Sequence, residues 1–169
     1  MEMVAQHWKK IGIRLDVKDT ERNLSLKQVA ANEQQFYVWG GGNADIFMWP
    51  RHDMPAEPNE PFSGTLYATW YASNGASGKK PEDPELLKAL ELFRGAFGKE
   101  EADRIKSAQE IWKLIVEETW TIGTVGLSPA VMGVRIVKNN LGNIPQRQFN
   151  GQHGRTPCAA MPVTWFFKS

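Results

Sequence analysis

The chain has 169 residues, which is enough to bury the hydrophobic core of one domain. Apolar residues make up 41% of the chain and charged residues 23%, and these globular proportions exclude disordered and fibrous proteins. The 20 basic and 19 acidic side chains nearly cancel, and no segment gathers the basic ones into a face for phosphates, so no nucleic-acid partner is expected.

The first forty residues predict helices that alternate with strands. Val4, Trp8 and Ile11 recur at helical spacing, and Gly12 is suited to end that helix. Apolar and charged residues then alternate, as they do in a half-buried strand. The order of helix and strand indicates an α/β fold with parallel strands. The expected elements are a helix ending at Gly12, a strand over 13–17, a helix over 23–31 and a strand over 36–39.

Residues 40–78 predict a long loop. The segment begins with three consecutive glycines and holds four prolines, and its aromatic residues follow no clear period. Long irregular segments inside a compact domain are often functional, and proline can order such a loop without a helix. The glycines are not followed by a helix start, so a phosphate-binding loop is not predicted.

The later part of the chain predicts a helical hairpin followed by strands. Asp83 is suited to cap a helix that starts at Pro84. Strands are expected over 121–127 and 131–137, and residues 139–169 predict an extended tail. The side chains expected to face inward are Leu86, Leu90, Phe93 and Phe97 on the first helix and Ile105, Ala108, Trp112 and Ile115 on the second.

Few residues have the pattern of a catalytic or metal site. Cys158 is the single cysteine, and the three histidines share no metal-ligand spacing, so no metal or cofactor is predicted. Asp45 follows the glycine turn, where a carboxylate could hold an ammonium group; the alternative is a turn residue that satisfies its own backbone. The adjacent His52 and Asp53 suit either an acid–base or metal role or simple solvation in a loop.

Several short motifs follow one another along nearly the whole chain. They are Trp-Lys-Lys-Ile-Gly-Ile at 8–13, Phe-Tyr-Val-Trp at 36–39, Trp-Tyr-Ala-Ser-Asn-Gly at 70–75, Trp-Thr-Ile-Gly-Thr-Val-Gly at 120–126, Asn-Asn-Leu-Gly-Asn-Ile-Pro at 139–145 and the closing Trp-Phe at 165–166. In order and spacing this series resembles family 5 extracellular solute-binding proteins, the peptide, nickel and oligosaccharide receptors of bacterial ABC importers.

The resemblance implies an α/β fold that forms part of the second lobe of a two-lobed, type II periplasmic-binding-protein-like receptor, with a mixed sheet flanked by helices. Residues 1–138 would belong to that C-terminal lobe, and residues 139–169 would return to the first lobe as an extended tail. The parent protein would be periplasmic or extracellular and membrane-anchored, with its signal peptide outside these residues. Apolar surface that the first lobe normally covers would favour self-association of the chain.

The function implied by the resemblance is capture of an oligopeptide or oligosaccharide for import, without chemistry, in partnership with the membrane subunits of the importer. Peptide-binding members use the Asp of a Trp-x-Ala-Asp run to hold the ligand amine, and here Asp45 keeps that position although Gly42 replaces the Trp. The residues expected to contact the ligand are Trp39, Asp45, Trp49 and Trp70.

Two alternatives to transport remain open at this point. One is a hydrolase that acts on a similar peptide or glycan through Asp45 and His52. The other is a receptor that senses the solute and passes the ligand state to a partner protein. The hydrolase would be distinguished by turnover of its substrate, whereas the sensing receptor and the transport component would both bind without turnover.

Overall fold

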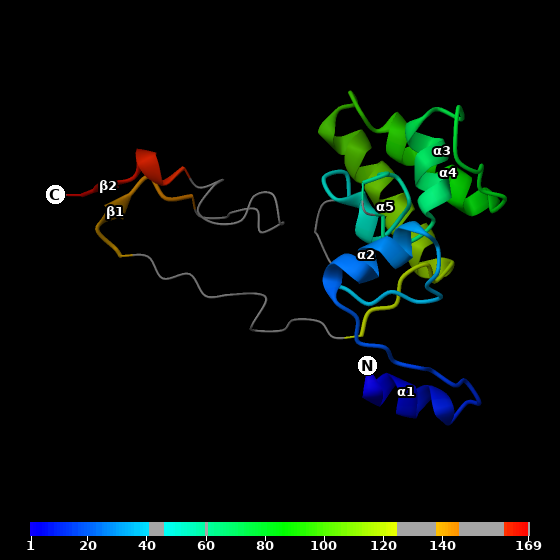
Figure 1. Ribbon diagram of the computed structural model, residues 1–169. Coiled ribbons are helices and arrows are strands. Elements are labelled where there is room, and N and C mark those ends of the chain that lie inside the picture. Colours follow the sequence, from blue (N-terminus) through cyan, green and yellow to red (C-terminus); the bar gives the residue numbers. More distant parts are fainter. Residues whose placement is uncertain (41–45, 60, 125–137, 146–160, 169) are drawn as a thin grey trace.

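The computed structural model describes residues 1–40, 46–59, 61–124, 138–145 and 161–168 (Figure 1). Helices dominate these residues, and a small antiparallel sheet of two strands accompanies them, which agrees with a mixture of helix and strand. The elements are α1 (Glu2–Lys9), α2 (Arg22–Ala30), η1 (Pro50–His52), α3 (Thr65–Ala72), α4 (Pro84–Gly95), α5 (Glu101–Glu117), β1 (Leu141–Gly142), η4 (Pro162–Thr164) and β2 (Phe166–Phe167).

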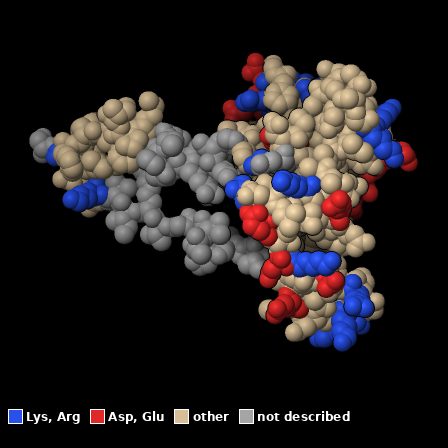
Figure 2. Space-filling view, viewed as in Figure 1, with Lys and Arg blue, Asp and Glu red and all other residues tan. Residues whose placement is uncertain are grey.

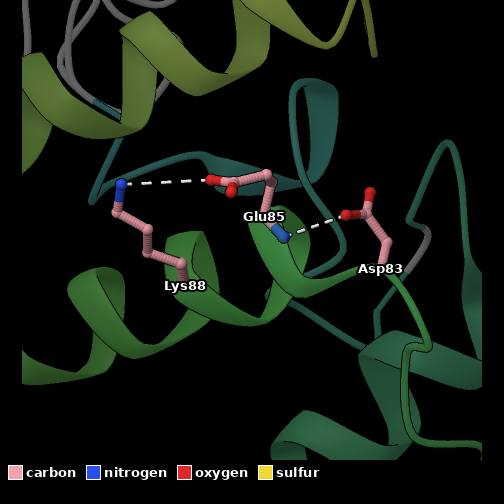
Figure 3. A network of polar contacts seen from close by, with 3 residues as sticks. All are labelled: Asp83, Glu85 and Lys88. Carbon is pink, nitrogen blue, oxygen red and sulfur yellow. Dashed lines mark hydrogen bonds and ion pairs between the residues drawn. The ribbon is translucent and has the colours of Figure 1, made fainter.

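The hairpin of α4 and α5 was predicted correctly, and local signals explain where α4 begins. The Asp83 carboxylate accepts a hydrogen bond from the backbone N–H of Glu85 at 2.9 Å and so satisfies one exposed donor of the first turn. Pro84 occupies the first helical position, where no backbone donor is needed. Figure 3 shows this cap beside the ion pair of Glu85 with Lys88, whose charged atoms are 3.9 Å apart. Both features favour a helix that starts at this point.

The hydrophobic core lies where α4 and α5 pack together, and the chain that precedes α3 closes it. Leu86, Leu90 and Phe93 face inward from α4 as predicted. Phe97 does not, because α4 ends at Gly95 and the Phe97 side chain is 62% exposed in the turn beyond it. The buried core cluster consists of Ile46, Met54, Ala56, Leu86, Ala89, Leu90, Phe93, Ile111, Leu114 and Ile115.

The buried face of α5 is rotated relative to the prediction. Ile105 was expected to be inside but is 50% exposed, whereas Leu114 is 4% exposed. The buried residues of α5 are Ser107, Ile111, Leu114 and Ile115, which recur at the spacing of one helix face. Ile115 is buried as predicted, and Ala108 and Trp112 pack partly buried against the core. The prediction was wrong at Ile105, because the polar Ser107 stands on the buried face in its place.

The predicted strands over 13–17 and 36–39 do not form. Both segments lie outside regular structure, and among the described residues neither pairs with another strand. Ile13 and Val17 are 47% and 40% exposed, so the alternating pattern has no sheet face to cover. An alternating sequence permits an extended backbone, but a strand exists only where a second strand supplies the hydrogen bonds. The parallel α/β unit is therefore not found in this part of the chain.

The first helix ends as the sequence predicted. The backbone N–H groups of Gly12 and Ile13 donate to the carbonyls of Lys9 and Trp8 at 3.2 and 3.0 Å, which is the double bond of a Schellman ending. Gly12 adopts a positive φ of 84°, the conformation this ending requires. In Figure 1, α1 lies beyond the group formed by α2, α3, α4 and α5.

The segment 40–78 holds a helix that was not predicted. α3 begins after Gly64, whose φ is +60° and which offers no capping side chain, so the usual start signal is missing. The Thr65 hydroxyl donates to the carbonyl of Val29 at 3.1 Å and ties α3 to the end of α2. The contact between Thr65 and Val29 therefore stabilises the start of α3, where no capping side chain is present.

Of the expected strands over 121–127 and 131–137, residues 121–124 are described and form no strand, and the remaining residues lie outside the described part of the chain. In the tail, β1 and β2 pair antiparallel, with Leu141 opposite Phe167 and Gly142 opposite Phe166. Figure 1 shows this pair well apart from the helices. In the part of the chain that the structure describes, no helix combines the length and the apolar character that crossing a bilayer requires.

Candidate functional site

Aromatic side chains gather where the extended segment 36–39 meets the proline-rich loop. We call this group the aromatic cluster, and it lies between α2 and the start of α3 in the chain. It draws on residues that are far apart in sequence, because the loop brings η1 and residue 62 against residues 37–39. The aromatic cluster consists of Tyr37, Trp39, Trp49, Arg51, His52 and Phe62.

Phe62 is the centre of the aromatic cluster. Its ring centroid lies 4.9 Å from that of Tyr37, 5.8 Å from that of Trp39 and 4.6 Å from that of His52. Tyr37 and Trp39 stack nearly parallel at 5.9 Å, with 9° between their planes. Offset and tilted ring pairs of this kind add stability beyond simple burial. Trp39 nevertheless stays 47% exposed, and the Arg22 guanidinium lies over its ring, 5.5 Å from the centroid.

Trp49 is held in place by two residues of its own loop. Its indole Nε1–H donates a hydrogen bond to Nε2 of His52. The guanidinium of Arg51 lies over the indole ring, 3.9 Å from its centroid, in a cation–π contact. A ring that is fixed from its edge and from one face loses little freedom when a ligand binds. The geometry makes Trp49 a preorganised flat surface.

The electrostatics of His52 follow from its position in the aromatic cluster. The pKa of His52 is lowered from 6.5 to about 4, first by burial and then by the Arg51 guanidinium, while a backbone hydrogen bond at Gly40 acts in the opposite direction. His52 is therefore neutral at pH 7. A neutral ring with Nε2 unprotonated is the form that can accept the bond from Trp49.

Asp53 is a buried carboxylic acid directly beside the aromatic cluster. It is 8% exposed, and within the described residues its Oδ2 has no hydrogen-bond partner. Burial raises the pKa of Asp53 from 3.8 to about 6. The hydroxyl of Tyr37 is likewise buried without a hydrogen-bond partner among the described residues. Buried polar atoms of this kind are uncommon and often mark a functional position.

A hollow of about 260 Å³ adjoins the aromatic cluster, and Trp49 belongs to both. Its walls include Phe47, Met48, Trp49, Glu57 and Phe93. Phe47 and Phe93 pack with ring centroids 5.5 Å apart, and Phe93 is only 5% exposed, so it forms the floor of the hollow from the core side. The hollow is therefore bounded by α4 on one side and by the proline-rich loop on the other.

A second hollow, of about 380 Å³, lies between α1 and the segment that follows it. Lys9, Arg14 and Leu15 line it, and aromatic rings do not. On the face drawn in Figure 2, acidic and basic side chains are interspersed over the helices, and a broad uncharged surface separates them. The hollow beside Trp49 combines aromatic rings with a carboxylate and is the better candidate for a ligand.

The four residues predicted to contact a ligand do not share one environment. Trp39 and Trp49 lie in the aromatic cluster, linked through Phe62 and His52. Trp70 instead packs from α3 against the hydrophobic core. Asp45 lies outside the described residues. The structure thus brings two of the predicted residues together and places a third in the framework.

Sequence reasoning missed several residues of the site. Phe62 and Arg51 bear no motif, and their importance comes from contacts across the loop. Glu57, which no motif marks, also lines the hollow. One local signal was available for Arg51 and His52, because residues two and three positions after Trp49 can turn back onto it in a short helical turn.

An acid–base role for His52 has a specific difficulty. The lone pair of Nε2 already accepts the bond from Trp49, so the nitrogen that would take a proton from a substrate is engaged. Among the residues that the structure describes, no group of three His, Cys, Asp or Glu side chains is arranged to hold a metal ion.

Comparison with known proteins adds no family to this geometry. No protein-family model matches the sequence, and no curated protein matches it.

Proposed function

We propose that this chain is the ligand-contacting part of the second lobe of a two-lobed solute-binding protein, which captures an oligopeptide or oligosaccharide for an ABC importer without chemistry. The observation that carries the proposal is the clamped indole of Trp49, which borders a hollow and belongs to the same aromatic cluster as the half-exposed Trp39. Rigid aromatic faces bind flat or apolar parts of a solute at low entropic cost.

Exposed apolar side chains beside the aromatic cluster support the proposal that the first lobe closes over this part of the chain. Phe36, Val38 and Trp39 are 64%, 52% and 47% exposed in one short segment. Exposed large apolar side chains that follow one another in this way favour contact with another protein surface. In the proposed receptor the first lobe would cover it, and in the isolated chain a second copy would compete for it.

The test is isothermal titration calorimetry of the 169-residue chain with trialanine and with cellotriose. We expect saturable binding of one of these solutes, and Trp39→Ala should weaken that binding about fivefold or more because a stacking face is removed. Phe167→Ala is the matched control, because it removes an aromatic side chain that is 70% exposed on β2, away from the aromatic cluster. Equal losses in both variants, or binding of neither solute, would speak against the proposal.

The hydrolase through Asp45 and His52 remains the alternative from another class. Incubation of the chain with the same solutes, followed by mass spectrometry, separates the two functions. Capture predicts that the solute is recovered intact, whereas hydrolysis predicts products that His52→Gln reduces. A sensing receptor would give the same binding as a transport component, and only its partner would differ.

A further inference from the structure

The segment between α1 and α2 has the sequence of a strand but no strand beside it among the described residues. Residues 13–17 read Ile-Arg-Leu-Asp-Val, so apolar and charged side chains alternate. Figure 1 shows this part of the chain as a long open stretch between the two helices. Arg14 and Asp16 are exposed, and the apolar Ile13 and Val17 are 47% and 40% exposed. Such a segment can accept a strand from another chain.

The backbone of this segment has hydrogen-bonding groups to offer. The N–H of Ile13 donates to the carbonyl of Trp8 at 3.0 Å, but the backbone groups of residues 14–17 make no hydrogen bond within the described residues. In an antiparallel pair, every second residue exchanges both of its backbone hydrogen bonds with the residue opposite. Because the N–H of Ile13 is engaged, Arg14 and Asp16 are the residues suited to make these bonds.

The order of charges makes the segment complementary to itself. When two copies lie antiparallel with Leu15 opposite Leu15, Arg14 of each copy lies opposite Asp16 of the other, and Ile13 lies opposite Val17. Opposite charges and apolar pairs directly across a ladder are favourable, whereas like charges are unfavourable. A shift by two residues would place Asp16 opposite Asp16 or Arg14 opposite Arg14, and a shift by one would place charged residues opposite apolar ones. The sequence therefore selects one register.

α1 lies beside the apolar row of this segment. Ile13 and Leu15 line the hollow of about 380 Å³ together with Ala5 of α1. Two strands alone are marginally stable in water and need a further element against their apolar face. In a pair of copies, α1 of each copy provides that element, and the hollow gives room for a side chain of the other copy.

We propose that residues 13–17 form an interface between two copies of this chain, which pair as antiparallel strands around Leu15 with Arg14 of each copy against Asp16 of the other. A two-fold axis at Leu15 makes each copy contribute the same residues. The segment is short, so the dimer is weak and forms as the concentration rises. The inference goes beyond the proposed function, because it involves neither the aromatic cluster nor its ligand.

The test is sedimentation equilibrium of the 169-residue chain over about 10–500 µM, where we expect a reversible dimer. Arg14→Glu places carboxylates opposite each other on both sides of the axis and should weaken the dimer about tenfold or more. Asp16→Lys should weaken it to a similar extent, because it places cations opposite each other. Arg104→Glu is the matched control, because Arg104 is an exposed residue of α5, and it should leave the dissociation constant unchanged.

A mixture of the two variants tests the register itself. When an Arg14→Glu chain meets an Asp16→Lys chain, the two substituted side chains face each other with opposite charges, and the two native ones do as well. We therefore expect the equimolar mixture to dimerise as tightly as the native chain, although each variant alone does not. A native chain that stays monomeric, or a dimer that Arg14→Glu weakens no more than Arg104→Glu does, overturns the proposal. A mixture that dimerises no better than its components overturns the antiparallel register and the proposal with it.

Discussion

Asp53→Asn provides a sharp test of the electrostatics around the aromatic cluster. Asp53 is buried and its pKa is raised from 3.8 to about 6, so the folded protein binds a proton here more readily than the unfolded chain. The contribution of such a group to stability is fully present below about pH 4 and is lost as the pH rises through 6. Asparagine cannot ionise, so the variant escapes this loss.

The neighbouring His52 acts in the opposite direction. Its pKa falls from 6.5 to about 4, so the unfolded chain binds the proton more readily, and stability is lost as the pH drops from 6.5 toward 4. The two effects offset each other between pH 4 and 6.5. Asp53→Asn removes the effect of Asp53 and keeps that of His52. Because only the native chain loses stability at Asp53 as the pH rises, the stability of the variant minus that of the native chain should rise across this window.

The magnitude follows from the pKa values. A rise from 3.8 to about 6 corresponds to about 3 kcal/mol at most. Water penetration and relaxation around the carboxylate reduce this to about 1–2 kcal/mol. We therefore expect Asp53→Asn to be about 1–2 kcal/mol more stable than the native chain at pH 7.5, with the difference vanishing near pH 3.5.

Urea unfolding followed by tryptophan fluorescence at pH 3.5, 5 and 7.5 measures these free energies. Asp103→Asn is the control, because Asp103 is an exposed residue of α5 that pairs with Lys106 at the surface. A stability difference for Asp53→Asn that is the same at all three pH values would refute the raised pKa of this buried carboxyl.

Two further predictions concern the framework. Ile111→Ala removes a side chain that is 0% exposed and should lower the free energy of unfolding by about 2–5 kcal/mol. Ile105→Ala, at a position that is 50% exposed, should lower it by less than about 1 kcal/mol. Equal losses in urea unfolding would contradict the buried face of α5 described above. Gly78→Ala places a Cβ against the carbonyl of Leu66 at a φ of +83° and should cost about 1–3 kcal/mol, while Gly95→Ala, with open space around it, should be neutral or stabilising. A thermal melt that leaves Gly78→Ala unchanged would count against this turn.

The sequence was most informative where local chemistry decides the structure. Asp83 and Pro84 define the start of α4, and Gly12 defines the end of α1, because caps and positive φ angles depend on a few adjacent residues. It was least informative where a distant partner decides. The segments 13–17 and 36–39 alternate like strands but have no strand beside them in the part that the structure describes.

In the candidate site, too, the residues that depend on distant contacts could not be predicted from the sequence. The family resemblance singled out Trp39 and Trp49, but it did not distinguish them from Trp70, which packs in the framework. The role of Phe62 as the centre of the aromatic cluster could not be predicted, because it depends on a fold of the loop that no local pattern encodes. Burial of Asp53 was missed for the same reason.

Native mass spectrometry of the 169-residue chain, after incubation with a mixed pool of tripeptides and neutral oligosaccharides, tests the central claim most directly. The account predicts a complex of the chain with one intact solute, released unchanged on activation and lost in Trp49→Ala. A chain that emerges without solute, or a pool in which peptides or glycans have been cleaved, would contradict solute capture.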